Sequence, residues 1–191
     1  FKSLGFSISD EETNNFVGIS NALMWHTLKQ KHGLKQTIQE LCELQRKGLI
    51  QYFREAVKNP IEGVVELMDC FIANGIPLGL ASSSSEELIR LVLDKLNITD
   101  KFSCIISGDN VERGKPEPDI FLEAARKLNE EPSDCLVIED SANGIKAAKA
   151  AGMKCIGFRN PSSGKQDLSM ADLVIDSFLK LDMSKINSLF I

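Results

Sequence analysis

The stretch CLVIEDSANGIKAAKAAG, residues 135–152, decides the fold because it joins a short apolar run directly to a helical segment. An uninterrupted apolar run before a helix is typical of a strand in a parallel sheet that helices cover on both faces. Gly152 gives the helix a C-terminal stop. Two adjacent carboxylates, Glu139 and Asp140, lie where the strand ends. Because parallel sheets bind ligands at the carboxyl ends of their strands, we expect the functional site there.

The same alternation of strands and helices runs on both sides of this stretch, from Pro60 onward. We predict strands at residues 76–81, 104–107, 135–138, 155–158 and 173–175. Helices are predicted at residues 85–96, from near Pro118, and at 141–151. The fold class is therefore α/β, with a Rossmann-like parallel sheet flanked by helices over residues 61–191.

Residues 1–60 have helical spacing and no convincing strand. Ser9 precedes three acidic residues, which favours a helix start, and Gly33 marks a helix end. Asn59 and Pro60 then break the pattern. We predict a helical domain at 1–60 that is attached to the α/β core at 61–191.

Composition excludes several classes of function. The chain has 191 residues, 27 acidic and 22 basic side chains and a net charge of −5, which argues against nucleic acid as a partner. No apolar run approaches the roughly 20 residues of a membrane span. The cysteines, which form no Cys-x-x-Cys pair, are Cys42, Cys70, Cys104, Cys135 and Cys155. We interpret them as reduced thiols of a cytoplasmic protein and expect a monomer.

A run of serines, Ser82 to Ser85, follows the first predicted strand and leads into a helix. Hydroxyls beside the free amides of a helix N-terminus form an anion site. A polar loop with an N-cap serine is the simpler alternative.

Lys115 follows the second predicted strand and stands between Gly114 and Pro116. This setting favours a fixed ammonium that neutralises a phosphoryl group or a carboxylate, although a solvated loop lysine is the alternative. Gly108 and Gly114 suggest a P-loop, but five residues separate them and no Ser or Thr follows the lysine, so we reject that motif.

The acidic pair after the third strand is the remaining signal. Two neighbouring carboxylates suit a hard cation such as Mg²⁺, although Asp140 and Ser141 could instead simply cap the helix that follows. Glu139 is harder to explain as a cap. Together, Ser82, Lys115 and this pair place a hydroxyl, an ammonium and two carboxylates at one sheet edge, a set that suits phosphoryl transfer.

Three motifs of the chain resemble, in order and spacing, those of the haloacid dehalogenase-like (HAD) hydrolase superfamily. They are Ser82, Gly114-Lys115-Pro116-Glu117-Pro118-Asp119, and Glu139-Asp140-Ser141-Ala142-Asn143-Gly144-Ile145. The branch they resemble most is that of the beta-phosphoglucomutase-like phosphatases and mutases. The first 60 residues, including Val17-Gly18-Ile19-Ser20, resemble the small helical cap domain of that branch.

This resemblance implies a Mg²⁺-dependent phosphatase that acts on a small phosphorylated metabolite, such as a sugar phosphate, through an aspartyl-phosphate. It implies that Ser82 and Ser83 bind the phosphoryl group and that Lys115, with Ser82, acts in catalysis. Asp140, supported by Glu139, would hold Mg²⁺.

The first motif of the superfamily, an apolar strand followed by Asp-x-Asp-Gly, has no counterpart in these residues. Its first aspartate is the nucleophile and its second is the general acid/base. The resemblance places that strand in the middle of the sheet, between the strands that end at Ser82 and Glu139. We therefore expect the central strand to be missing, and the sequence indicates a fragment of a longer protein.

Three alternatives stay open at the level of sequence. Mutases of this branch carry an arginine after Gly-x-Ser, whereas Asn21 follows Gly18-Ile19-Ser20 here, which favours a phosphatase. Asn21 and Arg46 are the candidate substrate contacts in the cap. The missing nucleophile also allows an inactive binding or regulatory module. A phospho-acceptor signalling domain fits less well, because its acidic pair precedes the hydroxyl and the lysine.

Overall fold

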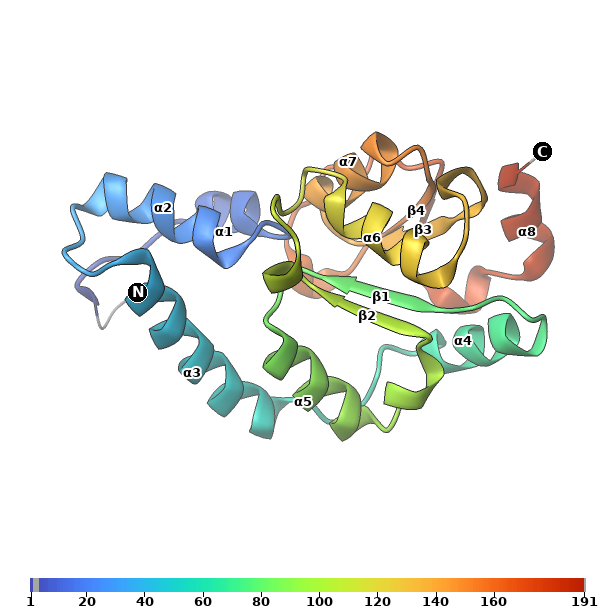
Figure 1. The fold of residues 1–191 in the computed structure, drawn as a ribbon, viewed down its shortest axis with the longest axis horizontal. Coiled ribbons are helices and arrows are strands. Elements are labelled where there is room, and N and C mark those ends of the chain that lie inside the picture. The colour runs from blue at the N-terminus through green and yellow to red at the C-terminus, as the bar shows by residue number, and fades with distance from the viewer. Residues whose placement is uncertain (2–3, 191) are drawn as a thin grey trace.

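The computed structural model describes residue 1 and residues 4–190, and within them the chain forms eight α-helices and five β-strands (Figure 1). In chain order these are α1 (Asp10–Phe16), α2 (Asn21–His32), α3 (Ile38–Ala56), α4 (Val64–Ala73), β1 (Gly79–Ser82), α5 (Glu86–Leu96), β2 (Cys104–Ser107), α6 (Asp119–Leu128), β3 (Leu136–Glu139), α7 (Ala142–Ala150), β4 (Lys154–Phe158), β5 (Leu173–Ile175) and α8 (Met183–Asn187).

The strands confirm the predicted parallel α/β core. β1 pairs with β2 in parallel, and β4 lies between β3 and β5 with both pairings parallel. Of the predicted strands, the first differs most, because β1 begins at Gly79 rather than at Ile76. Pro77 explains the later start, since proline has no backbone N–H to donate to a ladder.

The described strands form two separate sheets, β1–β2 and β3–β4–β5. This division agrees with the expectation that the strands ending at Ser82 and Glu139 are not direct neighbours. One apolar cluster nevertheless spans both sheets, since it contains Ile106 of β2 and Val137 of β3 together with Phe121 and Ile145 from the helices. Helix α5 covers one side of the strands, and α6 and α7 cover the other (Figure 1).

Helices α1, α2 and α3 form a separate body beside the strands (Figure 1). They pack around their own buried cluster of Met24, Trp25, Leu28 and Leu41. The predicted domain boundary at residue 60 falls in the segment between α3 and α4. Helices α4 and α8 are not among the helices predicted from the sequence. In the described part of the chain, no helix is long and apolar enough to cross a membrane.

Candidate active site

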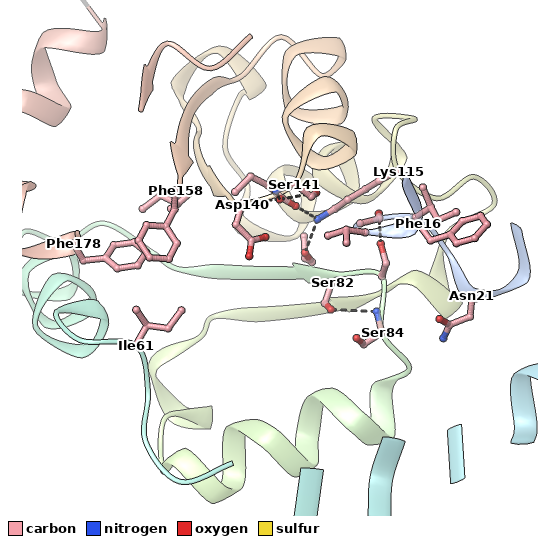
Figure 2. A pocket seen from close by; sticks show the side chains of 17 residues that line it. Phe16, Asn21, Ile61, Ser82, Ser84, Lys115, Asp140, Ser141, Phe158 and Phe178 are labelled. Carbon is pink, nitrogen blue, oxygen red and sulfur yellow. Dashed lines mark hydrogen bonds and ion pairs between the residues drawn. The ribbon is translucent and has the colours of Figure 1, made fainter. Parts of the chain in front are cut away.

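A cavity of about 490 Å³ lies where β1 and β3 end, with the cap segment 16–21 along one side (Figure 2). Its wall is polar near Lys115 and apolar near β4. The lining consists of Phe16, Val17, Gly18, Ile19, Asn21, Ile61, Ala81, Ser82, Ser83, Ser84, Lys115, Ile138, Glu139, Asp140, Ser141, Phe158 and Phe178. All of the predicted core site residues therefore line one cavity, and their chemical roles stay predictions.

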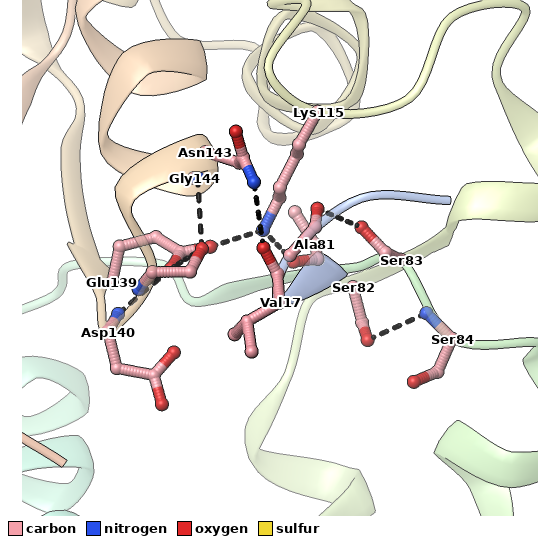
Figure 3. Close-up of polar contacts among 12 residues, drawn as sticks. Val17, Ala81, Ser82, Ser83, Ser84, Lys115, Glu139, Asp140, Asn143 and Gly144 are labelled. Atoms are coloured by element: carbon pink, nitrogen blue, oxygen red, sulfur yellow. Dashed lines mark hydrogen bonds and ion pairs between the residues drawn. The ribbon is translucent and has the colours of Figure 1, made fainter. Parts of the chain in front are cut away.

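Lys115 is fixed at the centre of this site although it comes from a loop. The residue is only 4% exposed, and its Nζ lies 2.5 Å from Glu139 Oε1 and 3.3 Å from the carbonyl oxygen of Ala81 (Figure 3). The ammonium also lies over the ring of Phe121, 4.7 Å from its centroid. The alternative of a solvated loop lysine is therefore wrong.

Glu139 is the partner that holds Lys115 in place. Its second oxygen, Oε2, accepts hydrogen bonds from the backbone amides of Asp140 and Ser141 and from the Ser141 hydroxyl, at 2.8, 2.9 and 3.0 Å. Burial raises the pKa of Glu139, but the charge and hydrogen bond of Lys115 and the bonds from Ser141 outweigh burial, so the net pKa lies below its ordinary value. Both oxygens are thus engaged within the chain, which favours a positioning role over the predicted role as a metal ligand.

Gly144 makes room for this carboxylate. A Cβ atom at residue 144 would lie 2.0 Å from the Glu139 carboxyl carbon, so no larger residue fits without displacing Glu139. Glycine at this position in α7 is therefore a requirement of the ion pair, which the sequence analysis did not identify.

We expect Gly144→Ala to lower the free energy of unfolding by about 3 kcal/mol, because it overpacks the site and displaces Glu139 from Lys115. Gly48→Ala in α3 is the matched control, since a Cβ there meets nothing within 4 Å. The control should stabilise the protein by up to ~1 kcal/mol, the ordinary gain of alanine over glycine in a helix. Urea denaturation of both variants measures the contrast, and a stabilised Gly144→Ala protein would contradict the assignment.

Asp140 differs from Glu139 because, within the described part of the chain, only one of its oxygens accepts hydrogen bonds. Oδ2 accepts hydrogen bonds from Asn160 Nδ2 at 2.6 Å and from Ser163 Oγ at 2.5 Å. Oδ1 receives none from the residues that the structure describes. The N-cap of α7 is Ser141, whose hydroxyl accepts from the Gly144 amide at 2.9 Å, so the cap alternative is confirmed for Ser141 and wrong for Asp140.

The serines after β1 have distinct partners. The Ser82 hydroxyl accepts from the Ser84 amide at 3.2 Å, whereas the Ser83 hydroxyl donates to the Gly18 carbonyl of the cap at 2.8 Å. Ser107, a fully buried residue of β2, donates to the Ser84 carbonyl at 2.7 Å and so fixes the loop. The sequence does not predict a role for Ser107, because its partner lies 23 residues away and no local pattern indicates the contact.

The two cap candidates lie in different places. Asn21, the first residue of α2, lines the cavity. Arg46 is not part of that lining; its guanidinium pairs with Glu43 at 2.8 Å and with Glu87 of α5. Its predicted substrate contact has no support in this arrangement.

The fit of Mg²⁺ depends on the donors at the cavity. Among the residues that the structure describes, no three His, Cys, Asp or Glu side chains group in a way that would hold a metal ion. Mg²⁺ does not require such a cage, since it commonly binds through one or two carboxylates, phosphate oxygens and waters. Asp140 offers a hard oxygen ligand of that kind beside a cavity that is large enough for a phosphate ester.

Comparison with known proteins agrees with this geometry. The sequence profile of the haloacid dehalogenase-like hydrolase family matches residues 1–158, and the chain belongs to this family. A putative phosphatase of Bacillus subtilis, YhcW, is 32% identical over 157 residues, which cover 82% of the chain and 70% of the relative. A beta-phosphoglucomutase of Clostridium difficile has a similar structure, with a TM-score of 0.86 at 27% identity over 99% of this chain and 85% of that one.

The resemblance to the beta-phosphoglucomutase-like branch is confirmed by these matches and by the beta-phosphoglucomutase of Bacillus subtilis, 40% identical over 60% of the chain and 48% of the relative. A bifunctional riboflavin kinase/FMN phosphatase of Arabidopsis thaliana is 43% identical over 128 residues, 65% of the chain. The chain spans only 33% of the length of that plant protein.

Proposed function

We propose that the full-length protein containing these residues is a Mg²⁺-dependent phosphatase that hydrolyses a phosphate monoester of a small metabolite through an aspartyl-phosphate. The observation that carries the proposal is the buried Lys115 ammonium, held 2.5 Å from Glu139 in a cavity that Ser82 and Asp140 also line. A fixed cation in a partly dry site stabilises the charge of a transferring phosphoryl group without reorganisation.

Each residue of the site has a defined task in this proposal. The Ser82 hydroxyl and the loop residues Ser83 and Ser84 of the cavity lining bind phosphoryl oxygens, and Lys115 neutralises their charge. Asp140 would hold Mg²⁺, which when bound neutralises further charge on the phosphate. The nucleophilic aspartate would come from outside the 191 residues, since the chain contains no Asp-x-Asp-Gly motif. The cavity between the two sheets is where such an aspartate can reach the phosphate.

A phosphatase fits the cap better than a mutase does. A mutase needs a firm grip on a second phosphate, for which an arginine provides a forked pair of hydrogen bonds. Asn21 occupies the cavity wall at the corresponding place, and Arg46 is engaged by Glu43 and Glu87. We also propose a cytoplasmic monomer. In support of that compartment, all five cysteines are free thiols.

The test is phosphate release from FMN and beta-glucose 1-phosphate, the compounds that the names of the relatives suggest. We expect Mg²⁺-dependent turnover of at least one phosphate monoester, and its loss in EDTA. Asp140→Asn should lower turnover by roughly 10³-fold, because the amide binds the cation poorly. The exposed Asp134→Asn variant is the control. Turnover that persists in EDTA, or in Asp140→Asn, would contradict the proposal.

A further inference from the structure

The segment that follows β4, residues 160–166, contacts Asp140, the candidate cation ligand. With neighbouring residues it lines a second cavity of about 300 Å³, and Asp140 belongs to the walls of both cavities. Nothing in the roles assigned so far uses this segment. Two of its side chains, Asn160 and Ser163, reach Asp140, and a third, Gln166, reaches the cap.

Asn160 and Ser163 act on the same oxygen of Asp140. Their hydrogen bonds, at 2.6 and 2.5 Å, both end on Oδ2. Two donors on one oxygen fix the rotation of the carboxylate and leave Oδ1 as the oxygen that a cation can use. Groups that hydrogen-bond to a metal-binding carboxylate in this way hold it in orientation before the metal binds.

Gln166 links these donors to two other parts of the molecule. Its Nε2 donates to the Ser163 carbonyl at 3.0 Å and to the cap carbonyl of Asn14 at 3.2 Å. Its Oε1 accepts from the Ala142 amide in the first turn of α7 at 3.1 Å. One side chain therefore joins the cap, the segment that holds Asp140, and the helix that follows Asp140.

Residues 160–166 also pack closely against the cap. A Cβ at Gly164 would lie 2.1 Å from the Asn14 side-chain oxygen, and Gly164 has a φ of +68°, which disfavours other residues. The backbone of residues 163–166 consequently follows the position of Asn14. A shift of the cap would move the carbonyl of Ser163, and with it the hydroxyl that orients Asp140.

We infer that Asn160 and Ser163 are positioning residues that set the affinity of Asp140 for a divalent cation. We also infer that Gln166 makes this affinity depend on whether the cap contacts residues 163–166 as it does here. The inference rests on the proposed function for the presence of the cation. Such coupling is reciprocal: if contact with the cap raises the cation affinity by some factor, a bound cation favours that contact by the same factor.

Binding of Mn²⁺, a paramagnetic substitute for Mg²⁺, tests the inference without turnover. The affinity is measured by electron paramagnetic resonance on the full-length protein with no substrate. We expect Ser163→Ala and Asn160→Ala each to weaken Mn²⁺ binding about tenfold, the usual effect of removing such a support. Ser163→Thr keeps the hydroxyl and should keep the affinity. Ser162→Ala is the matched control, because Ser162 is an exposed neighbour of the same chemistry.

Gln166→Leu tests the link to the cap. In the wild type, Mn²⁺ should slow amide hydrogen exchange in residues 14–18; in Gln166→Leu it should not. The inference is overturned if Ser163→Ala and Asn160→Ala bind Mn²⁺ as tightly as Ser162→Ala does, or if Mn²⁺ protects residues 14–18 equally in Gln166→Leu. A wild-type protein that binds no Mn²⁺ would overturn the proposed cation-dependent function as well, which distinguishes the two failures.

Discussion

Lys115→Met is expected to lower phosphatase turnover by roughly 10³-fold or more in the full-length protein. The methionine fills a similar volume but carries no charge, so the transferring phosphoryl group loses a fixed cation at the place where negative charge accumulates. Release of phosphate at saturating Mg²⁺ measures the effect. Lys127→Met, an exposed lysine of α6, is the matched control and should retain full turnover.

The loss must be separated from unfolding, because Lys115→Met also leaves the Glu139 carboxylate buried without its cation. The double variant Lys115→Met/Glu139→Gln removes both charges and should recover most of the stability while it stays inactive. Full turnover in either form would show that Lys115 does not act on the phosphate.

The convergence of Ser82, Lys115 and Asp140 was predictable because it follows from topology alone. Strands that alternate with helices are parallel, and the residues after each strand then meet at one edge of the sheet. Neither the exact strand lengths nor the helix packing matters for this conclusion. The predicted residues therefore line one cavity although β1 begins three residues later than predicted.

Helix α4 is not predicted, because its identification depends on the local sequence pattern and not on topology. Its sequence, VVELMDCFIA, is apolar at nearly every position, so periodicity cannot tell a buried helix from a strand. Its N-cap residue is Gly63, which makes no side-chain cap hydrogen bond, so the sequence also lacks the usual signal of a helix start.

The different tasks of Glu139 and Asp140 could not be predicted from sequence either. The two carboxylates are neighbours in the chain, and the sequence predicts both of them at one cation site. The donors that distinguish them come from elsewhere: Lys115 for Oε1 of Glu139, and Asn160 and Ser163 for Oδ2 of Asp140. Which oxygen stays available is a property of the folded loops, and no spacing of residue types encodes it.

Glu139→Gln is expected to lower the free energy of unfolding by about 3 to 5 kcal/mol, because breaking a buried ion pair leaves one charge uncompensated. The glutamine amide would also turn a donor toward the Lys115 ammonium, which is itself 4% exposed. In a double-mutant cycle with Lys115→Met, the sum of the stability losses of the two single variants should far exceed the loss in the double variant. Losses that simply add in urea denaturation would contradict a coupled pair.

The pH dependence of the stability lost in Glu139→Gln provides a second check on the Lys115–Glu139 ion pair. The pKa of Glu139 lies below its ordinary value, so its ionised form stabilises the fold above about pH 4.3, the usual glutamate value. That contribution disappears as the pH falls through the lowered pKa. Glu139→Gln has no such group to protonate. The difference in stability between wild type and Glu139→Gln should therefore be constant near neutral pH and shrink below about pH 4.3, whereas a constant difference into acid would exclude a charged Glu139 as its source.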